Sequence, residues 1–271
     1  MDVVIRLENL SKSFGDACVL SHVNRDFEAG KIHGIVGNNG SGKTVMMKCI
    51  CGFLQPTEGR VWVNYKQVGK DVDFPPDMGI IIETPGFLPN LSGRKNLELL
   101  AALQKKIGVE TIRKTLIRVG LDPDMKKPVS KYSLGMRQRL GIAQAIMEEP
   151  SLLILDEPFN GLDRTGTAQM RQLIRELREQ GRTILLASHN QADIDELCDT
   201  VCEMDAGVMT MIRQTRITGT QEDHQERLRK KRRKKSLILI RKKSIRKSAG
   251  KSAWKSLWKA LSNGFLRITG L

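Results

Sequence analysis

The sequence predicts an α/β protein with a parallel-sheet core, an antiparallel β flap, a helical insertion and a basic C-terminal tail that is helical or disordered. Three observations carry this prediction. From residue 31 onward, short β-branched runs alternate with amphipathic stretches, as in parallel sheets covered by helices. Residues 1–30 and 58–69 instead alternate with period two, which is typical of a sheet covered on one face. After Ile217 the composition turns polar and then basic, so that segment has too little apolar surface for a core.

The strands follow from these two patterns. In the flap, every second position is apolar or aromatic: Val3, Ile5, Leu7, Val61, Val63 and Tyr65. The core strands are predicted at 32–36, 79–82, 152–155 and 183–187. Continuous apolar runs such as 152–155 fit strands that are buried on both faces. The predicted body is therefore a mixed structure and not a purely doubly wound one.

The helical insertion is predicted at about residues 84–148. Ser92 is a suitable N-cap for the helical pattern that follows it. The composition change places a boundary near residue 215, which divides the chain into a body of residues 1–215 and a tail of residues 216–271.

Charge separates the body from the tail. Residues 224–271 hold 17 Lys and Arg and one acid, a net charge of +16, which leaves −1 for residues 1–223 of the total +15. An anionic partner is therefore indicated for the tail alone. No apolar run approaches the length that crosses a bilayer, and the N-terminus is acidic, so we expect a cytoplasmic protein.

The five cysteines show no zinc-site spacing. They are Cys18, Cys49, Cys51, Cys198 and Cys202, and no histidine lies among them in such a pattern. We expect buried or inert thiols, because free cysteine usually packs as a small apolar residue.

A phosphate-binding loop follows the strand predicted at 32–36 and opens a predicted helix. Its residues are Gly37, Asn38, Asn39, Gly40, Ser41, Gly42, Lys43 and Thr44. Glycines let successive N–H groups point at phosphate oxygens, and the helix start adds positive potential. Lys43 is expected to reach the outer phosphates and Thr44 to ligate Mg²⁺. The core is thus predicted to be of the P-loop NTPase type, with ATP and Mg²⁺ as ligands.

The second half of the site is predicted at the end of strand 152–155. Asp156 is the candidate for holding Mg²⁺, and the adjacent Glu157 is the candidate for polarising the attacking water. His189 also ends a strand, where a neutral imidazole can contact the γ-phosphate. A single histidine in this position is more often structural, so its assignment depends on the resemblance described next.

These motifs, in this order, resemble the ABC ATPase family. The deciding element is Tyr-Ser-Leu-Gly-Met-Arg-Gln-Arg-Leu at 132–140, which is similar to the family's signature loop. The resemblance covers about residues 2–215 and implies an ABC-type nucleotide-binding domain there. It implies that Ser133 and Gly135 complete the ATP site of a second ATPase subunit, identical or different. A helix start at a phosphate is also physically reasonable, although an ordinary capped helix has the same pattern.

Two further family features map onto this chain. Phe14 lies where an aromatic ring would stack on adenine, and a core position is the alternative. The segment 160–163, which ends at Asp163, lies where the family has its dimer-contact loop.

Two departures from the family pattern are informative. Glu83 stands where most members have a glutamine that contacts Mg²⁺ and links ATP hydrolysis to the permease. With the segment 85–94, it resembles the subgroup that exports bacitracin or gives lantibiotic immunity, which implies peptide antibiotics or similar amphiphiles as cargo. Leu134 and Met136 replace the usual glycine and glutamine beside Ser133, which bears on the strength of the contact to the partner subunit.

The tail contains a basic amphipathic pattern. Within residues 248–262, four apolar residues lie on one helical face and three lysines recur beside them: Trp254, Leu257, Trp258, Leu261, Lys251, Lys255 and Lys259. This pattern suits an anionic membrane surface. Nucleic-acid binding, docking on the permease, and a solvated or unrelated tail remain alternatives.

The sequence therefore predicts a Mg²⁺-dependent ATP hydrolase that energises a separate integral-membrane permease from the inner face of the cell membrane. The alternative is a non-transport ABC ATPase that acts on ribosomes or nucleic acid through the tail. Such proteins usually carry two cassettes or a long coiled coil, and this sequence has one cassette and no coiled coil.

Overall fold

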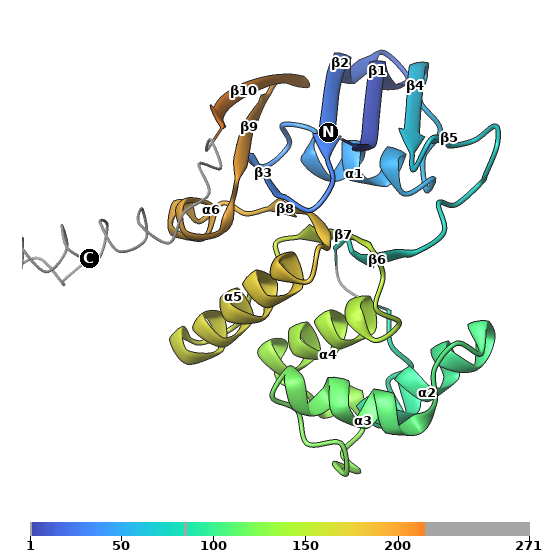
Figure 1. The fold of residues 1–271 in the computed structure, drawn as a ribbon, viewed down its shortest axis with the longest axis vertical. Coiled ribbons are helices and arrows are strands. Elements are labelled where there is room, and N and C mark those ends of the chain that lie inside the picture. The colour runs from blue at the N-terminus through green and yellow to red at the C-terminus, as the bar shows by residue number, and fades with distance from the viewer. Residues whose placement is uncertain (1, 84–85, 215–271) are drawn as a thin grey trace, which may run out of the picture. The chain divides into compact units, whose positions relative to one another are not determined.

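The flap predicted at the N-terminus is a four-stranded antiparallel sheet. The computed structural model describes residues 2–83 and 86–214. Strands β1 (Val3–Phe14), β2 (Ala17–Glu28), β4 (Glu58–Val63) and β5 (Lys66–Gln67) pair in the order β2-β1-β4-β5 (Figure 1). One face of this sheet carries the buried residues predicted by the alternation, such as Ile5 and Val61.

The second sheet has six strands in the order β10-β9-β3-β8-β7-β6. Its strands are β3 (Ile32–Val36), β6 (Met78–Ile81), β7 (Leu152–Asp156), β8 (Thr183–Ala187), β9 (Thr200–Asp205) and β10 (Val208–Gln214). Neighbouring strands from β9 to β6 are parallel, and β10 is antiparallel to β9. All residues of β7 and β8 are buried, because layers cover both faces.

The predicted core strands agree closely with these bounds. Strands β3 and β8 match the prediction at both ends, β6 lies one residue earlier, and β7 continues through Asp156. The sequence pattern did not indicate β9 and β10. The mixed α/β class with a parallel-sheet core is confirmed.

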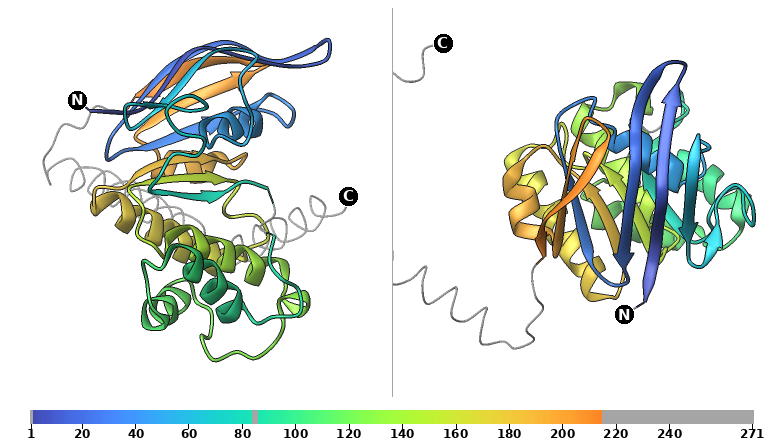
Figure 2. Two further views of the ribbon diagram at one scale, coloured as in Figure 1. Left: turned by 90° about the vertical axis from the view of Figure 1, so that its right-hand side faces the viewer. Right: turned by 90° about the horizontal axis from the view of Figure 1, so that it is seen from above.

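Helix α1 (Lys43–Ile50) lies between the two sheets (Figure 2). Its buried residues belong to one apolar cluster with the inner face of the flap and with alternate residues of β7 and β8. The helices on the other face of the six-stranded sheet form a second cluster. Met46 and Met47 are completely buried, so α1 and the phosphate loop before it are held by apolar packing from both sides.

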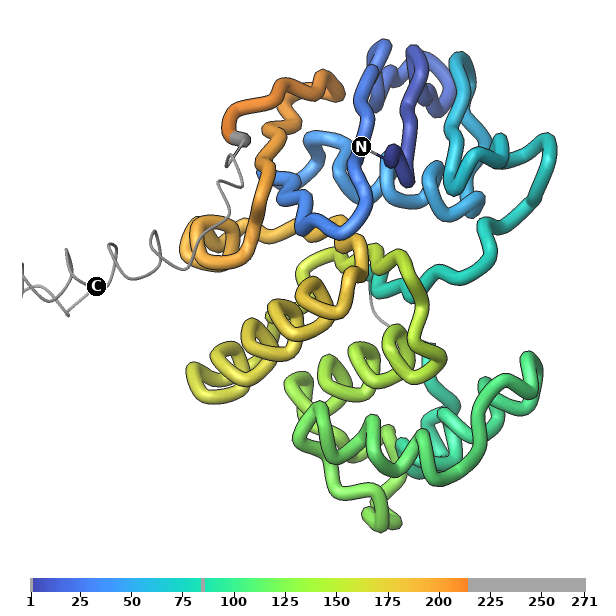
Figure 3. The backbone as a smooth tube through the Cα atoms, in the orientation of Figure 1, coloured from blue at the N-terminus to red at the C-terminus, as the bar shows by residue number. Residues whose placement is uncertain are grey.

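The helical insertion leaves the sheet after β6 and returns at β7 (Figure 3). It contains α2 (Gly93–Gln104), α3 (Val109–Arg118), a short 3₁₀ turn (Val129–Lys131) and α4 (Leu134–Ile146). The side chain of Ser92 accepts a hydrogen bond from the Lys95 amide at 3.4 Å, so the predicted N-cap is confirmed. Helices α5 (Arg164–Glu179) and α6 (Gln191–Leu197) follow β7 and β8.

Four of the five cysteines are buried, and Cys18 is exposed. Burial raises the pKa of the Cys49 thiol to about 11 and those of Cys51 and Cys198 to about 12. These thiols therefore stay protonated and unreactive at neutral pH.

The basic amphipathic pattern at 248–262 and the whole segment 215–271 lie outside the described residues. The boundary near residue 215 stays a prediction. Within the described part of the chain, no helix is long and apolar enough to cross a membrane.

Candidate nucleotide site

The phosphate loop connects the end of β3 to the start of α1, as its motif predicts. Two of its glycines are sterically required. Gly37 has φ +144°, and a Cβ there would lie 2.1 Å from the Met204 carbonyl oxygen. Gly42 has φ +106°, and a Cβ there would lie 2.9 Å from the Val19 carbonyl oxygen. Any side chain at either position would displace the loop from the strands that hold it.

The start of α1 offers donors without a protein acceptor. Its N-cap is Gly42, which provides no side-chain hydrogen bond, and the first turn contains no acidic residue. The buried Ser41 hydroxyl has no hydrogen-bond partner in the described part of the chain. Uncapped N–H groups and the helix dipole together favour an anion at this position. The loop is therefore built to receive phosphate.

Lys43 folds its side chain back over the loop. Its ammonium donates hydrogen bonds to the carbonyl oxygens of Gly37 at 2.7 Å and Asn38 at 3.0 Å, and the residue is 7% exposed. No carboxylate among the described residues forms an ion pair with it. Its full positive charge is thus compensated only by backbone dipoles, which leaves it available for a phosphate oxygen.

A cavity of about 230 Å³ lies in front of this loop. Its lining combines loop residues with the two acids at the end of β7: Val19, Asn39, Gly40, Gly42, Lys43, Thr44, Val45, Asp156 and Glu157. The Thr44 hydroxyl donates a hydrogen bond of 2.6 Å to Asp156. A hydroxyl oxygen beside a carboxylate is a donor set that suits Mg²⁺. Two of the predicted metal residues, Thr44 and Asp156, therefore meet the phosphate loop in one cavity that suits a Mg²⁺-nucleotide.

Glu157 lies against His189 from the end of the adjacent strand β8. One carboxylate oxygen is 2.8 Å from His189 Nδ1. Burial raises the pKa of Glu157 above its usual value, and the neighbouring imidazole opposes that shift. The backbone of Glu157 has φ +49°, an uncommon conformation for this residue type that is found at functional sites. A carboxylate with a raised pKa and an orienting partner can accept a proton from water.

The loop that carries His189 is anchored by polar contacts. The Ser188 hydroxyl donates to Asp193, which is 1% exposed and forms an ion pair with Arg171 of α5. The backbone N–H of Asn190 donates a hydrogen bond to the Ser188 hydroxyl at 3.1 Å. This network holds the backbone on both sides of His189, while the imidazole itself is 65% exposed.

Glu83 lies outside the cavity lining, at the end of β6. Its carboxylate forms an ion pair of 2.6 Å with Lys48 of α1 and is 63% exposed. Because β6 runs parallel to β7 with Ile81 opposite Leu155, Glu83 follows the strand next to the one that carries the acidic pair.

The remaining predicted site residues are not brought into this cavity. Ser133 is exposed and caps α4 by accepting from the Met136 amide at 3.2 Å. A Cβ at Gly135 would lie 2.7 Å from the Gly161 carbonyl oxygen, so the signature loop packs against the loop that ends at Asp163. Asp163 caps α5. Phe14 is 48% exposed and therefore not a core residue, and the Lys12 ammonium lies 5.1 Å from its ring centroid.

Sequence reasoning missed three residues near the site. Val19 lines the cavity from β2, the Gln138 amide of α4 donates to the Glu157 carbonyl oxygen at 3.2 Å, and Lys48 pairs with Glu83. Gln138 lies inside the signature motif, which was the one available signal. Val19 reaches the site only through packing between distant segments, and the contact of Lys48 with Glu83 likewise joins two segments that are distant in the chain.

The fold and the site define a class: an α/β nucleotide hydrolase whose phosphate loop faces a carboxylate from a strand of the same parallel sheet. Residues 20–160 match the family model described as ABC transporter. The chain belongs to the ABC transporter family and is an ATP-binding, ATP-hydrolysing subunit that uses ATP with Mg²⁺. The family inferred from the signature loop is confirmed.

The relatives also agree with the inferred subgroup. The chain is 44% identical over 211 residues to the bacitracin transport ATP-binding protein BcrA of Enterococcus faecalis, covering 76% of this chain and 68% of that protein. It is 37% identical over 206 residues to the lantibiotic transport ATP-binding protein SrtF of Streptococcus pyogenes, covering 73% and 85%. A dimeric bacterial ABC transporter cassette shares the fold, with a TM-score of 0.72 at 23% identity over 78% of this chain and 99% of that one.

Proposed function

We propose that this subunit drives the export of peptide antibiotics or similar amphiphiles through a separate membrane permease. The observation that carries the proposal is the 44% identity to a bacitracin transport ATP-binding protein. The 37% identity to a lantibiotic transport protein supports the same cargo class. The alternative, a non-transport ATPase acting on ribosomes or nucleic acid, has no support among these relatives.

The roles of the site residues follow from their positions. The loop N–H groups and Lys43 hold the phosphates, and Thr44, Asp156 and Glu83 are the residues that would hold Mg²⁺. Bound Mg²⁺ supplies charge neutralisation at the phosphates. Glu157 orients the attacking water and accepts its proton, and His189 keeps the Glu157 carboxylate in place and lies ready to contact the γ-phosphate.

We infer that a second nucleotide-binding subunit, identical or different, completes the site. Ser133 and Gly135 are outside the cavity of their own chain, and Ser133 and Leu134 are exposed at the start of α4. The Ser133 hydroxyl accepts one hydrogen bond from its own helix, which leaves its O–H donor for a phosphate oxygen of the partner's nucleotide. Packing of Gly135 against the loop that ends at Asp163 makes both segments part of one contact surface.

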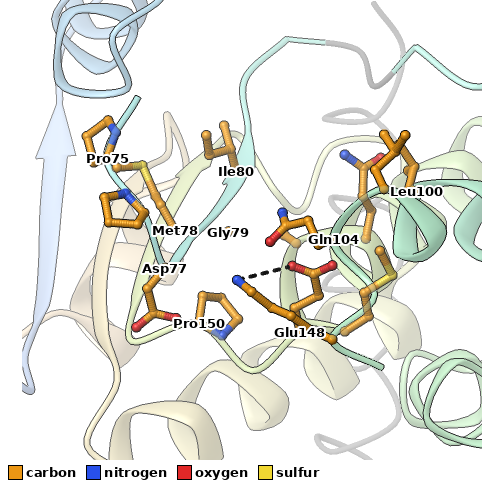
Figure 4. Close-up of a pocket in the computed structure, with 15 residues that line it drawn as sticks. Pro75, Asp77, Met78, Gly79, Ile80, Leu100, Gln104, Glu148 and Pro150 are labelled. Atoms are coloured by element: carbon orange, nitrogen blue, oxygen red, sulfur yellow. Dashed lines mark ion pairs between the residues drawn. The ribbon is translucent and has the colours of Figure 1, made fainter. Parts of the chain in front are cut away.

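The permease is proposed to dock at a groove along the free edge of β6. We call this the β6-edge groove (Figure 4): a hollow of about 330 Å³ bounded by Pro75, Asp77, Met78, Leu100, Leu103, Gln104, Glu148 and Pro150. Leu103 is 80% exposed, and Lys106 and Glu148 form an ion pair of 3.9 Å within the groove. An apolar side chain flanked by charges suits an amphipathic helix of a partner.

The groove is connected to the site through a single short strand. Strand β6 begins at Met78 in the groove, pairs with β7 as far as Ile81, and leads to Glu83 two residues later. A shift of β6 caused by the permease would therefore move Glu83 relative to Asp156 and Glu157. This is the physical route proposed for coupling ATP hydrolysis to transport.

The location proposed for the protein is the inner face of the cell membrane. The permease contact accounts for it in the body. The 17 basic residues among 224–271 would add attraction to anionic lipid, of roughly 1 kcal/mol for each charge near the surface.

The test is a pull-down from cells with the Glu157→Gln variant and Mg-ATP. We expect this variant to lose roughly 10²–10⁴-fold in turnover because no group accepts the proton, while it retains nucleotide and favours a dimer. A multi-span permease should co-purify with it. Adding Leu103→Glu in the groove should remove the permease from the recovered proteins.

Leu99→Glu is the matched control, because Leu99 is 50% exposed on the same helix and lies outside the groove. Equal recovery of the permease with both leucine variants would show that the β6-edge groove is not the docking site. Recovery of ribosomes or nucleic acid in place of a permease would contradict the transport function.

A further inference from the structure

The segment 48–53, which begins in α1, lies against the segment 74–83, which contains β6, and three contacts join the two segments. The Lys48 ammonium pairs with Glu83 at 2.6 Å, the Cys51 Sγ lies 3.6 Å from the Met78 Sδ, and the rings of Phe53 and Phe74 have centroids 6.0 Å apart. The residue numbers rise along one segment while they fall along the other. The helix that begins at the phosphate loop therefore runs antiparallel to the strand that leads to Glu83.

Lys48 is one helical turn from the metal side of the site. It follows Thr44 by four residues in α1, so the two side chains lie on the same helix face. The Thr44 hydroxyl is bonded to Asp156. The Lys48–Glu83 ion pair and the Thr44–Asp156 hydrogen bond are thus neighbouring links between the same helix and adjacent strands.

Three carboxylates follow adjacent strands at this edge of the sheet. Asp156 ends β7 and Glu157 follows it, and Glu83 comes two residues after β6, whose last residue Ile81 pairs with Leu155 of β7. Within residues 2–83 and 86–214, Lys48 is the one cation that pairs with Glu83.

This ion pair contributes little to stability. The two side chains are 28% and 63% exposed, and exposed pairs contribute about 0–1 kcal/mol. The contact instead fixes the direction of the Glu83 side chain. Without it, that side chain has little support, because Glu83 follows a four-residue edge strand and has φ +60°. The ion pair holds its carboxylate against the face of α1 that Lys48, in the last turn, shares with Thr44 in the first turn.

We propose that Lys48 is a positioning residue that orients the Glu83 carboxylate toward the metal side of the nucleotide site. This inference rests on the proposed role of Glu83 as a Mg²⁺ ligand. Lys48 compensates the charge that glutamic acid brings to this position, and it ties that charge to the same helix as the phosphate loop. Its own ammonium does not touch the nucleotide.

The experiment compares full-length Lys48→Gln, Glu83→Gln, the double variant and Lys48→Arg. Arg6→Gln is the control, because Arg6 forms an exposed ion pair with Asp26 in the flap, outside the site. The first measurement is the Mg²⁺ concentration for half-maximal ATPase activity at saturating ATP. The second is amide hydrogen exchange at residues 81–83 in the nucleotide-free protein.

We expect Lys48→Gln and Glu83→Gln each to raise the half-maximal Mg²⁺ concentration by roughly threefold to tenfold, and the double variant to match Glu83→Gln alone, because both changes remove one interaction. Lys48→Arg should restore the wild-type value. Lys48→Gln should also speed exchange at 81–83, whereas Arg6→Gln should leave both measurements unchanged.

Two results would overturn the role of Lys48 while leaving that of Glu83. In the first, the changes in half-maximal Mg²⁺ concentration multiply in the double variant. In the second, Lys48→Gln behaves like the wild type while Glu83→Gln is impaired. A silent Glu83→Gln would instead remove the proposed role of Glu83, and the positioning role of Lys48 with it.

Discussion

The phosphate loop lies at the start of helix α1 and the signature loop at the start of helix α4, yet the two helix starts are capped differently. Helix α1 begins after Gly42, without a side-chain cap, and the adjacent Ser41 hydroxyl has no partner among the described residues. Helix α4 begins at an ordinary serine cap, in which Ser133 accepts from the Met136 amide. One helix start is left open, and the other is already satisfied by its own chain.

This difference shows how the two motifs relate to ATP. An open helix start leaves N–H groups that can bind an anion, so the start of α1 gains stability when a phosphate binds. The cap of α4 stabilises the helix without any ligand, and its hydroxyl can serve a second subunit without weakening the fold. The proposed binding in the chain's own cavity and the proposed donation to a partner thus depend on different local chemistry.

The largest effect is expected at the open helix start. Lys43→Gln removes the ammonium that lies over the loop, and we expect ATP hydrolysis to fall by at least about a hundredfold, as for loss of a preorganised charged donor. Nucleotide binding, followed by a fluorescent ATP analogue, should weaken in parallel. Lys66→Gln, at an exposed position in β5, is the matched control. Unchanged nucleotide binding in Lys43→Gln would contradict the role given to the start of α1.

An intermediate effect is expected at the capped helix start. Ser133→Ala and Ser92→Ala each remove an N-cap serine from a helix of the insertion, so both should lower the free energy of unfolding by about 1 kcal/mol. Only Ser133→Ala should reduce ATPase activity, by roughly tenfold, because its hydroxyl is proposed to serve the partner subunit. The measurements are denaturant unfolding and ATPase rate. Equal activity of the two variants would assign Ser133 a structural role alone.

The smallest effect concerns stability beside the open helix start. Burial raises the pKa of Glu157 above the ordinary value of 4.5, so the folded protein binds this proton more tightly than the unfolded chain. The stabilising contribution is complete below the ordinary pKa and is lost as pH rises through the raised value. We therefore expect Glu157→Gln to raise the Tm at neutral pH and to lose this advantage in acid, as measured by thermal unfolding. A lower Tm at neutral pH would indicate that the His189 contact outweighs burial.

The opposite signs of the last two changes sharpen the comparison. Removing Ser133 should weaken the fold, whereas neutralising Glu157 should strengthen it, because the nucleotide edge keeps unsatisfied groups for its ligand. The cap at α4 has no such conflict.

Much of this site was predictable because its motifs are local. The phosphate loop, the acids after strand 152–155 and His189 each follow a buried strand, and carboxyl ends of parallel strands meet at one edge of a sheet. Strands β3 and β8 matched their predicted bounds for a related reason, since a short, mostly apolar run with β-branched residues suits a strand that is buried between two covering layers. The proximity of Thr44 to Asp156 and of Glu157 to His189 followed from that arrangement.

The sequence by itself determined the class of fold, the family and the position of the phosphate loop between β3 and α1, because spacing within a few residues decides those features. Only the tertiary structure decided that Lys48 meets Glu83, that Gln138 holds the backbone of Glu157, and that Val19 closes the cavity from the flap. It also decided that β9 and β10 extend the sheet. These contacts join segments that are distant in the chain, and their register is set by packing between layers, which no local pattern encodes.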